Sequence, residues 1–141
     1  MKIKAVNNLD SWELALDKLD KEGFPDIPPY PKQGALWWVV GAPDKDITVG
    51  FAGLKLVGHD TAFLCRAYVK RSYKGLGLHR KLIQIREKAA RKLGCKFLIT
   101  YTHPLNLSSA NNLITCGMKL YNPANPFGMP GALYFRKDLT K

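Results

Sequence analysis

The spacing of polar and apolar positions changes from element to element along the first part of the chain. MKIKAV at 1–6 alternates polar and apolar side chains, which is typical of a strand with one buried face. A helix is expected over about 10–22, with Asp10 as its N-cap. ALWWVVGA at 35–42 and ITVGFAGLKLV at 47–57 are rich in β-branched and aromatic residues. The PDKD turn between these two runs predicts a hairpin.

The second part of the chain continues to alternate strand and helix patterns. TAFLCRAYV at 61–69 predicts a strand, and a helix follows from about 76 to 93. The apolar residues of this helix are spaced to form one buried stripe, namely Leu78, Leu82, Ile85, Ala89 and Leu93. KFLITYT at 96–102 predicts a strand, and LNLSSANNLITC at 105–116 predicts a short helix. Two last strands are expected over MKLY and ALYFRKDL.

The order β-α-β-β-β-α-β-α-β-β predicts an α/β fold with a mixed, mainly antiparallel sheet and helices on its faces. The strands at 61–69 and 96–102 flank a helix, so we expect them to be parallel neighbours joined by a right-handed crossover. The length of 141 residues suits a single domain, 1–141.

Charge is distributed unevenly along this framework. The formal net charge is +11, and between Arg66 and Lys96 eleven Lys and Arg residues are opposed by Glu87 alone. This excess indicates a polyanionic partner, either a phosphorylated cofactor or a nucleic acid.

Several other classes of protein are disfavoured by the sequence. Cys65, Cys95 and Cys116 form no C-x-x-C pair, and the histidines have no metal-ligand spacing with them, so we expect no metal site. Scattered, unpaired cysteines are typical of a reduced, cytoplasmic protein. No apolar run reaches membrane-spanning length, and the first residues lack the apolar stretch of a secretory signal.

The candidate chemistry begins at YKGLGLHRKL, residues 73–82, where a strand pattern gives way to a helix pattern. Gly75 and Gly77 allow a tight turn that directs backbone N–H groups toward one point, and glycine leaves room for phosphate oxygens to approach. Lys74 and Arg80 flank the turn and add charge. The run matches neither a P-loop nor a complete Rossmann fingerprint.

Together with its flanks, AYVKRSYKGLGLHRKLI at 67–83 resembles the acetyl-CoA-binding motif of the GNAT superfamily of N-acetyltransferases. Val69 takes the place of the strand end, Lys74 that of the motif's Arg or Gln, and Gly77 that of its central glycine. Gly75 matches a frequent extra glycine, and His79 stands at the last Gly or Ala place, where we expect its side chain to point outward.

A second segment, NLSSANNLITCGM at 106–118, is similar to the family's other cofactor segment through Asn106, Ser109, Gly117 and Met118. The resemblance implies a GNAT-like fold with a central, splayed pair of parallel strands and acetyl-CoA as cosubstrate. It also implies that a backbone N–H near Tyr68 or Val69 polarises the thioester carbonyl. The residues implied in cofactor binding are Tyr68, Val69, Lys74, Gly75, Leu76, Gly77, Leu78, His79, Arg80, Asn106 and Ser109.

In this family the acetyl group passes directly to a primary amine, so the resemblance implies an amine acceptor, either a small molecule or a protein. Leu113 stands where many members carry the tyrosine that protonates the departing thiolate. We therefore expect Tyr101 or His103 to supply or relay a proton, and Ser109 to act near the sulfur. Asp60 is a further candidate base, with a turn role as the alternative.

The segments 24–31 and 122–131 are expected at the acceptor entrance. Asp20, Glu22 and Asp26 are expected to form a solvated helix end, with attraction of a cationic amine as the alternative. Two other functions stay open at this point. The basic helix suits a nucleic-acid phosphate backbone, although no aromatic RNA-binding signature accompanies it. Leu113 also fits a CoA-binding protein without catalytic activity. The protein is expected to be a monomer or a homodimer.

Overall fold

A computed structural model describes residues 1–42 and 47–141, so the predicted PDKD turn lies outside the described residues. The elements along the chain are β1 (Lys2–Ala5), α1 (Leu9–Gly23), β2 (Leu36–Ala42), β3 (Ile47–Leu56), β4 (Thr61–Val69), a short 3-10 turn (Arg71–Tyr73), α2 (Leu78–Lys92), β5 (Phe97–Thr102), α3 (Leu107–Thr115), β6 (Lys119–Leu120) and β7 (Leu133–Asp138). This order is the one predicted from the hydrophobic pattern.

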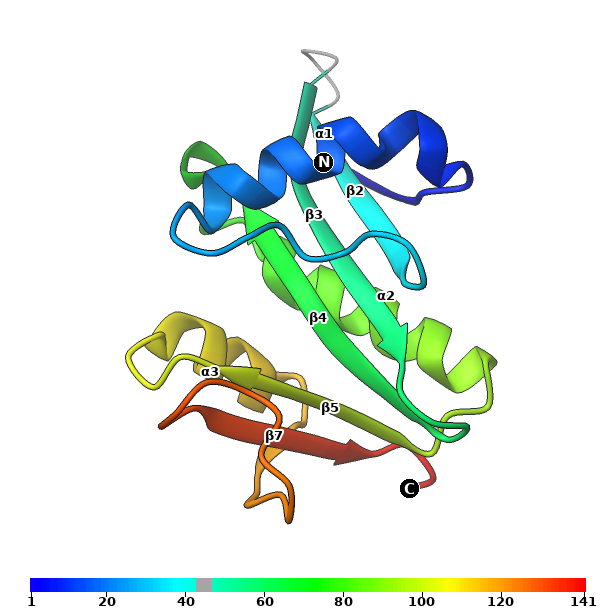
Figure 1. Cartoon of the computed structure of the whole chain (residues 1–141), viewed down its shortest axis with the longest axis vertical. Helices are drawn as coiled ribbons and strands as arrows, with labels where there is room; N and C mark the ends of the chain where they lie inside the picture. The colour runs from blue at the N-terminus through cyan, green and yellow to red at the C-terminus, as the bar shows by residue number, and fades with distance from the viewer. Residues whose placement is uncertain (43–46) are drawn as a thin grey trace.

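The strands form one sheet in the order β1-β2-β3-β4-β5-β7-β6. Neighbouring strands are antiparallel except for β4 and β5, which are parallel. The predicted mixed, mainly antiparallel sheet and its parallel pair are therefore confirmed. β4 and β5 can be parallel because α2 carries the chain from the end of β4 back to the start of β5 (Figure 1), and β3 and β7 flank the pair inside the sheet.

Helices cover both faces of the sheet, as predicted (Figure 1). On one face α1 packs Leu16 and Leu19 against Trp37, Val39 and Phe51. On the other face α2 and α3 share a larger core with the alternate side chains of the strands, among them Trp38, Val40, Leu64, Leu98 and Phe135. Trp37 and Trp38 thus face opposite sides of β2, as a strand requires.

The buried stripe of α2 differs from the predicted one. Leu78 and Leu82 are buried as expected, but the stripe continues through Ile83, Arg86 and Ala90, and Leu93 is 51% exposed. The helix is therefore rotated about its axis relative to the expectation. Apolar spacing misses this rotation because one member of the buried stripe is an arginine.

The start of α1 also differs from expectation. Its N-cap is Asn8, whose side chain makes no capping hydrogen bond, and Asp10 lies within the first turn. An acidic side chain there still favours the positive end of the helix dipole.

The parallel strands separate soon after they meet. Pairing between β4 and β5 covers Thr61 with Phe97, Ala62 with Leu98, and Phe63 with Ile99. The Thr100 hydroxyl then donates to the Leu64 carbonyl (2.8 Å), the last polar link before the strands diverge. Figure 1 shows β4 and β5 close at their first residues and apart at their last. This opening, the splay, is central to the candidate site.

Candidate functional site

A β-bulge in β4 controls the orientation of the strand beside the splay. Ala52 pairs with Ala67 and Leu54 with Leu64, so Cys65 and Arg66 of β4 lie opposite the single residue Gly53. The bulge shifts the alternation of side chains by one position. Cys65 packs toward α1, and Arg66 also reaches α1, where it binds Asp20.

The bulge is held from the opposite face by Arg86, which the sequence analysis did not identify. Arg86 is 3% exposed; its Nη1 donates to the Gly53 carbonyl (2.9 Å) and its Nε to the Leu82 carbonyl (3.1 Å). Burial lowers the pKa of the Arg86 guanidinium to about 10. Burying a charged group is costly. The hydrogen bond offsets part of this cost because it satisfies a carbonyl that the bulge removes from the ladder.

Beyond the bulge, β4 presents its backbone to the splay. The Lys70 N–H donates to the Val49 carbonyl (2.7 Å), on the β3 side. Backbone groups of successive residues point to alternate edges of a strand, so the N–H of Val69 points toward β5 and the N–H of Tyr68 toward β3. Of the two predicted N–H donors, Val69 therefore faces the splay, and the Tyr68 hydroxyl binds Glu22 (2.7 Å) on the α1 side.

The glycine turn connects this strand end to α2. Gly75 and Gly77 have φ values of 82° and 74°, in the left-handed region that favours glycine, and a Cβ at either position would meet no atom within 4 Å. Gly77 is the N-cap of α2, and it has no side-chain cap. The surface above both glycines is therefore open to a ligand.

The start of α2 offers donors to that surface. The Lys81 N–H donates to the Gly77 carbonyl (3.1 Å), so the N–H groups of Leu78, His79 and Arg80 precede the first hydrogen bond of the helix. Such groups and the helix dipole favour an anion. Lys74, Leu76 and Arg80 are exposed beside them, and the Arg80 Nε donates to Asn112 Oδ1 (3.0 Å), which fixes that side chain next to α3.

His79 does not point outward as the sequence analysis expected. It is half-buried and continues the buried stripe of Ile83 and Arg86 at helical spacing. Burial, with the positive charges of Arg86 and Lys74, lowers the pKa of His79 to about 4. The imidazole is therefore neutral near pH 7 and adds no charge at the start of α2.

The His79 shift predicts a loss of stability in acid. The unfolded chain binds a proton at His79 near pH 6.5 and the folded chain only near pH 4, so stability rises with pH between these values. From pH 6.5 to 4 we expect His79 to remove roughly 3 kcal/mol from the free energy of unfolding. Urea titrations of His79→Gln should show a shallower decline than those of the wild type. Parallel curves for the two proteins would contradict the assignment.

The second predicted cofactor segment forms α3. The Asn106 side chain accepts from the Ser109 N–H (3.1 Å) and caps the helix, which leaves its amide NH2 free for other contacts. Ser109 is half-buried in the first turn. Leu113 is 5% exposed and packs into the core with α2, so this position contributes packing and no proton.

Near the open end of the splay lies a buried hydroxyl without a partner. Thr100 and Thr102 point to the same side of β5, and both are buried. Whereas Thr100 bonds to Leu64, Thr102 Oγ1 is the one buried side-chain N or O atom among the described residues that lacks a hydrogen bond. β4 has diverged by this position, so the partner comes from outside the chain, as a ligand or a bound water.

The predicted proton-transfer residues lie at the end of β5. Tyr101 is half-buried on the α1 face, and His103, just after the strand, is exposed. The Leu105 N–H donates to His103 Nδ1 (3.1 Å), which leaves Nε2 as the proton-bearing nitrogen of the neutral ring. Asp60 lies at the opposite end, where its carbonyl accepts from the N–H groups of Lys96 and Phe97. That position supports its turn role.

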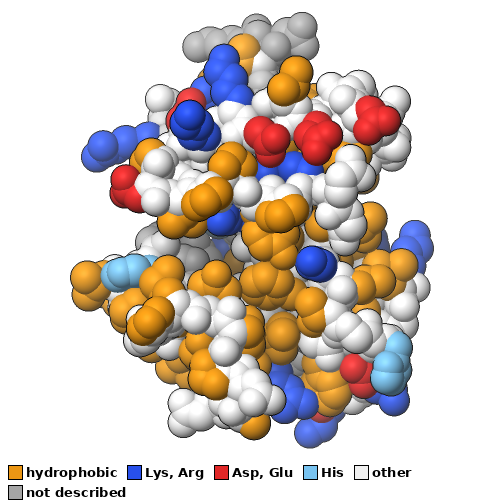
Figure 2. Space-filling model, viewed as in Figure 1, with side chains coloured by type: hydrophobic (Ala, Val, Ile, Leu, Met, Phe, Trp, Pro, Cys, Tyr) orange, Lys and Arg blue, Asp and Glu red, His pale blue; other side chains and the backbone are white. Residues whose placement is uncertain are grey.

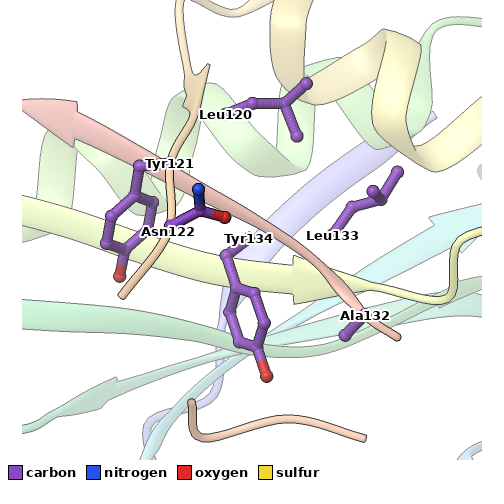
Figure 3. A pocket seen from close by; sticks show the side chains of 6 residues that line it. All are labelled: Leu120, Tyr121, Asn122, Ala132, Leu133 and Tyr134. Carbon is purple, nitrogen blue, oxygen red and sulfur yellow. The ribbon is translucent and has the colours of Figure 1, made fainter. Parts of the chain in front are cut away.

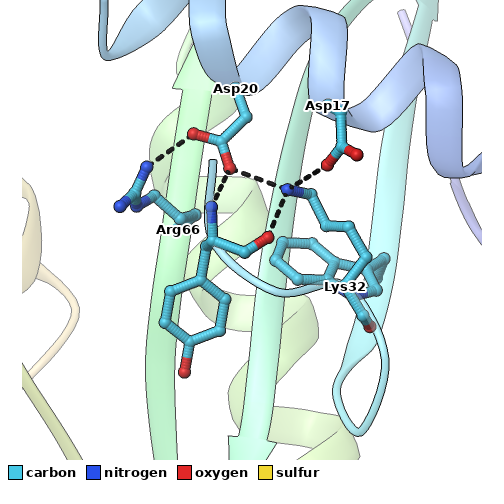
Figure 4. A network of polar contacts seen from close by, with 6 residues as sticks. Asp17, Asp20, Lys32 and Arg66 are labelled. Atoms are coloured by element: carbon cyan, nitrogen blue, oxygen red, sulfur yellow. Dashed lines mark hydrogen bonds and ion pairs between the residues drawn. The ribbon is translucent and has the colours of Figure 1, made fainter. Parts of the chain in front are cut away.

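The acidic end of α1 is not solvated as expected. Asp20 is fully buried and accepts from Lys32 Nζ (2.7 Å), Arg66 Nη1 (2.5 Å) and the Tyr30 N–H (2.8 Å), and Lys32 also pairs with Asp17 (2.9 Å). Figure 4 shows both aspartates reaching down from α1 to this network. Asp20 therefore links α1, the 24–34 loop and β4, and both oxygens of its carboxylate accept hydrogen bonds within the protein.

A pocket of about 270 Å³ lies between β6 and β7, lined by Leu120, Tyr121, Asn122, Ala132, Leu133 and Tyr134. Figure 3 shows the rings of Tyr121 and Tyr134 pointing to the same side of these strands. Among the described residues there is no group of His, Cys, Asp and Glu side chains that could hold a metal ion. No helix in the described parts of the chain is long and apolar enough to cross a bilayer.

Both predicted cofactor segments, 67–83 and 106–118, fall within the part of the chain that matches a known protein family. The sequence profile of the acetyltransferase (GNAT) family matches residues 5–118. The chain therefore belongs to the GNAT acetyltransferase family, as its motifs predicted. No curated protein sequence matches it.

Solved structures share the fold at low sequence identity. A GNAT-family acetyltransferase from Staphylococcus aureus has a TM-score of 0.78 and 16% identity, covering 98% of this chain and 99% of that one. The ribosomal-protein-S18-alanine N-acetyltransferase of Escherichia coli has a TM-score of 0.77 and 15% identity, covering 98% and 94%. A Bacillus subtilis acetyltransferase in complex with CoA has a TM-score of 0.74 and 15% identity, covering 97% of each.

Proposed function

We propose that the protein is an acetyl-CoA-dependent N-acetyltransferase that moves the acetyl group directly to a primary amine. The observation that carries this proposal is the coincidence of three features at one end of the molecule. The free N–H groups of α2 suit a pyrophosphate, the splay suits an extended arm, and the open Gly75–Gly77 surface links them. Lys74, Arg80, Asn106 and Ser109 complete the cofactor set.

The residues present fit the cofactor. The pantetheine arm of CoA carries amide groups that hydrogen-bond to a strand edge, and by the same alternation the backbone groups of Ala67 and the carbonyl of Val69 face the splay from β4. The unpartnered Thr102 hydroxyl lies where such an arm would pass, and a buried polar atom without a partner is costly unless a ligand satisfies it. When bound, acetyl-CoA supplies an activated thioester.

The chain's own groups then position and polarise the reactants. The Val69 N–H serves as oxyanion donor to the thioester carbonyl, since of the two predicted N–H groups it is the one that faces the splay. Holding amine and thioester in contact supplies much of the rate acceleration. Tyr101 and His103 are the proton-transfer groups, and Ser109 lies on the α3 side near the sulfur. Leu113 is buried and has no proton to donate, so proton transfer is assigned to Tyr101 and His103.

Cofactor binding is tested by a pair of isosteric variants. Thr102→Val removes the unpartnered hydroxyl, so we expect a free energy of unfolding higher by about 1 kcal/mol and CoA affinity about three- to tenfold weaker. Thr100→Val removes a made hydrogen bond, so we expect destabilisation by about 1–3 kcal/mol. Adenosine 3′,5′-bisphosphate lacks the pantetheine arm and should bind Thr102→Val as tightly as wild type in calorimetry.

Two outcomes of this experiment contradict different claims. Unchanged CoA affinity in Thr102→Val would exclude the hydroxyl as a cofactor contact. Failure of wild-type protein to bind either ligand would remove the basis of the proposed function.

The nucleic-acid alternative is less well supported by the arrangement of the basic side chains. Arg86 is buried, Arg66 pairs with Asp20, and Arg91 pairs with Glu87. The run of bases that suggested a phosphate backbone is therefore partly consumed within the protein. Titrating a short RNA or DNA duplex beside acetyl-CoA ranks the two functions directly.

A further inference from the structure

Four aromatic side chains meet on the α1 face beside the splay. They are Phe63 of β4, Tyr101 of β5, Tyr134 of β7 and Phe127 of the loop before β7. We call them the aromatic cluster. Phe63 and Tyr101 stack with centroids 6.0 Å apart, and Phe127 contacts both edge-on at 5.8 Å. Phe127 and Tyr134 are 5.0 Å apart.

The loop that carries Phe127 is anchored to this cluster. The Gly128 N–H donates to the Tyr134 hydroxyl (3.0 Å), and a Cβ at Gly128 would lie 2.7 Å from the Tyr101 ring. The backbone thus passes directly over Tyr101, and glycine is required there. Phe127 nevertheless remains 39% exposed, so one large apolar ring is held at the surface.

The cluster borders the place where acetyl transfer is proposed to occur. Phe63 belongs to the last pair of β4 with β5, and Tyr101 lies two residues beyond its partner Ile99. Both side chains point away from α2, because their neighbours Leu64 and Leu98 pack in the α2 core. The start of α2 belongs to the cofactor in the proposed function, so an acceptor approaches the thioester from the α1 face.

The same surface continues across the splay to the 24–34 loop. Burial raises the pKa of Tyr30, and the Cys65 and Tyr101 side chains are smaller causes of the same shift. The Arg66 guanidinium lies over the rings of Phe24 (4.7 Å) and Tyr30 (5.7 Å). Figure 2 shows apolar side chains gathered across the middle of this face.

The charges around this surface argue against a polycationic acceptor. Asp20 forms ion pairs with Lys32 and Arg66, and Glu22 accepts hydrogen bonds from the Tyr68 hydroxyl and Lys70. The aromatic rings pack edge-on and stacked against one another instead of enclosing a cation. The pocket of about 270 Å³ that shares Tyr134 with the cluster offers adjoining space for a small apolar group.

We propose that the acceptor is a small primary amine attached to an aromatic or similarly apolar body. The body packs on Phe127 and the aromatic cluster, and the amino group points into the splay. This inference rests on the proposed function and deepens it by naming the acceptor class. In the transfer, the amine nitrogen forms the new bond to the acetyl carbon, the C–S bond breaks, and the amine proton leaves as the CoA thiol forms.

The test compares three amines by CoA-thiol release: phenethylamine, propylamine and spermidine. In the wild type we expect kcat/KM for phenethylamine to exceed that for propylamine at least about tenfold, because burying a phenyl group is worth that factor. Phe127→Ala should reduce this ratio at least about fivefold. Phe127→Leu, which keeps an apolar group, should reduce it less.

Phe97→Ala is the matched control. Phe97 lies on the same strand and face as Tyr101 of the cluster, but it packs under Arg136 (4.0 Å) at the far end of β5. This variant should keep the wild-type ratio. A preference for spermidine, or a ratio unaffected by Phe127→Ala, would overturn the proposal.

Failure of the proposed function is recognised separately. If CoA binds but no amine is acetylated, phenethylamine and spermidine are titrated into the CoA-bound protein by calorimetry. Phenethylamine binding that weakens in Phe127→Ala then supports the acceptor class even without turnover. No phenethylamine binding, or tighter spermidine binding, overturns it.

Discussion

Gly77→Asp is expected to weaken acetyl-CoA binding by at least about a hundredfold while the protein still folds. Aspartate is among the few residues that tolerate the left-handed backbone of Gly77, and no neighbouring atom would meet its Cβ. Its carboxylate at the N-cap would accept from the free N–H groups of α2 and repel the cofactor's phosphates at short range. The variant therefore places an anion of its own in the proposed cradle.

Two controls separate charge from strain. Gly58→Asp has the same φ sign (79°) and open surroundings but lies in the turn before β4, so it should lose similar stability and bind the cofactor normally. Gly77→Asn has nearly the shape of aspartate without its charge, and its effect on Kd should be intermediate. A folded Gly77→Asp protein with wild-type Kd in calorimetry would exclude the turn as the cofactor site.

The turn was predictable from sequence because its chemistry is local. Two glycines with positive φ, a helix start and flanking bases all lie within 73–82. The order of strands was predictable for a similar reason, since each element has its own hydrophobic period and the β-α-β unit fixes the parallel pair.

The network around Asp20 and the buried Arg86 were not predictable in this way. Each depends on residues far apart in the sequence: Asp20 binds Arg66, and Arg86 binds the carbonyl of Gly53. Charged residues are normally read as solvent-exposed, and apolar spacing assigned the wrong stripe to α2. The bulge that needs Arg86 has no signature in the strand pattern of TAFLCRAYV.

In the candidate site, too, local features were predictable from the sequence, and features that depend on residues far apart were not. The choice of the Val69 N–H over that of Tyr68, the Thr102 hydroxyl and the aromatic cluster become visible only in the folded structure, where β4 and β5 diverge. Tyr101 and His103 are proposed as proton-transfer residues because they lie at the end of a strand expected to splay. Sequence reasoning had no means of seeing that the Tyr101 ring packs against Phe63 and Phe127.

Tyr101→Phe is expected to lower kcat by at least about tenfold, since a general acid or base typically contributes about 10²- to 10⁴-fold. The substitution removes the hydroxyl and keeps the ring, so the aromatic cluster and acceptor KM should change little. His103→Asn is its counterpart: the amide oxygen still accepts from the Leu105 N–H, but no titratable group remains. The measurements are steady-state kcat and KM by thiol release, with a separate acetyl-CoA Kd for each variant.

The two residues give distinguishable results. If His103 carries the proton, kcat falls in His103→Asn and stays near the wild-type value in Tyr101→Phe. If Tyr101 carries it, the two results are reversed. Wild-type kcat in both variants would show that bulk water protonates the thiolate. Since Leu113 is buried in the core and has no proton to donate, catalysis would then rest on positioning and on the Val69 N–H.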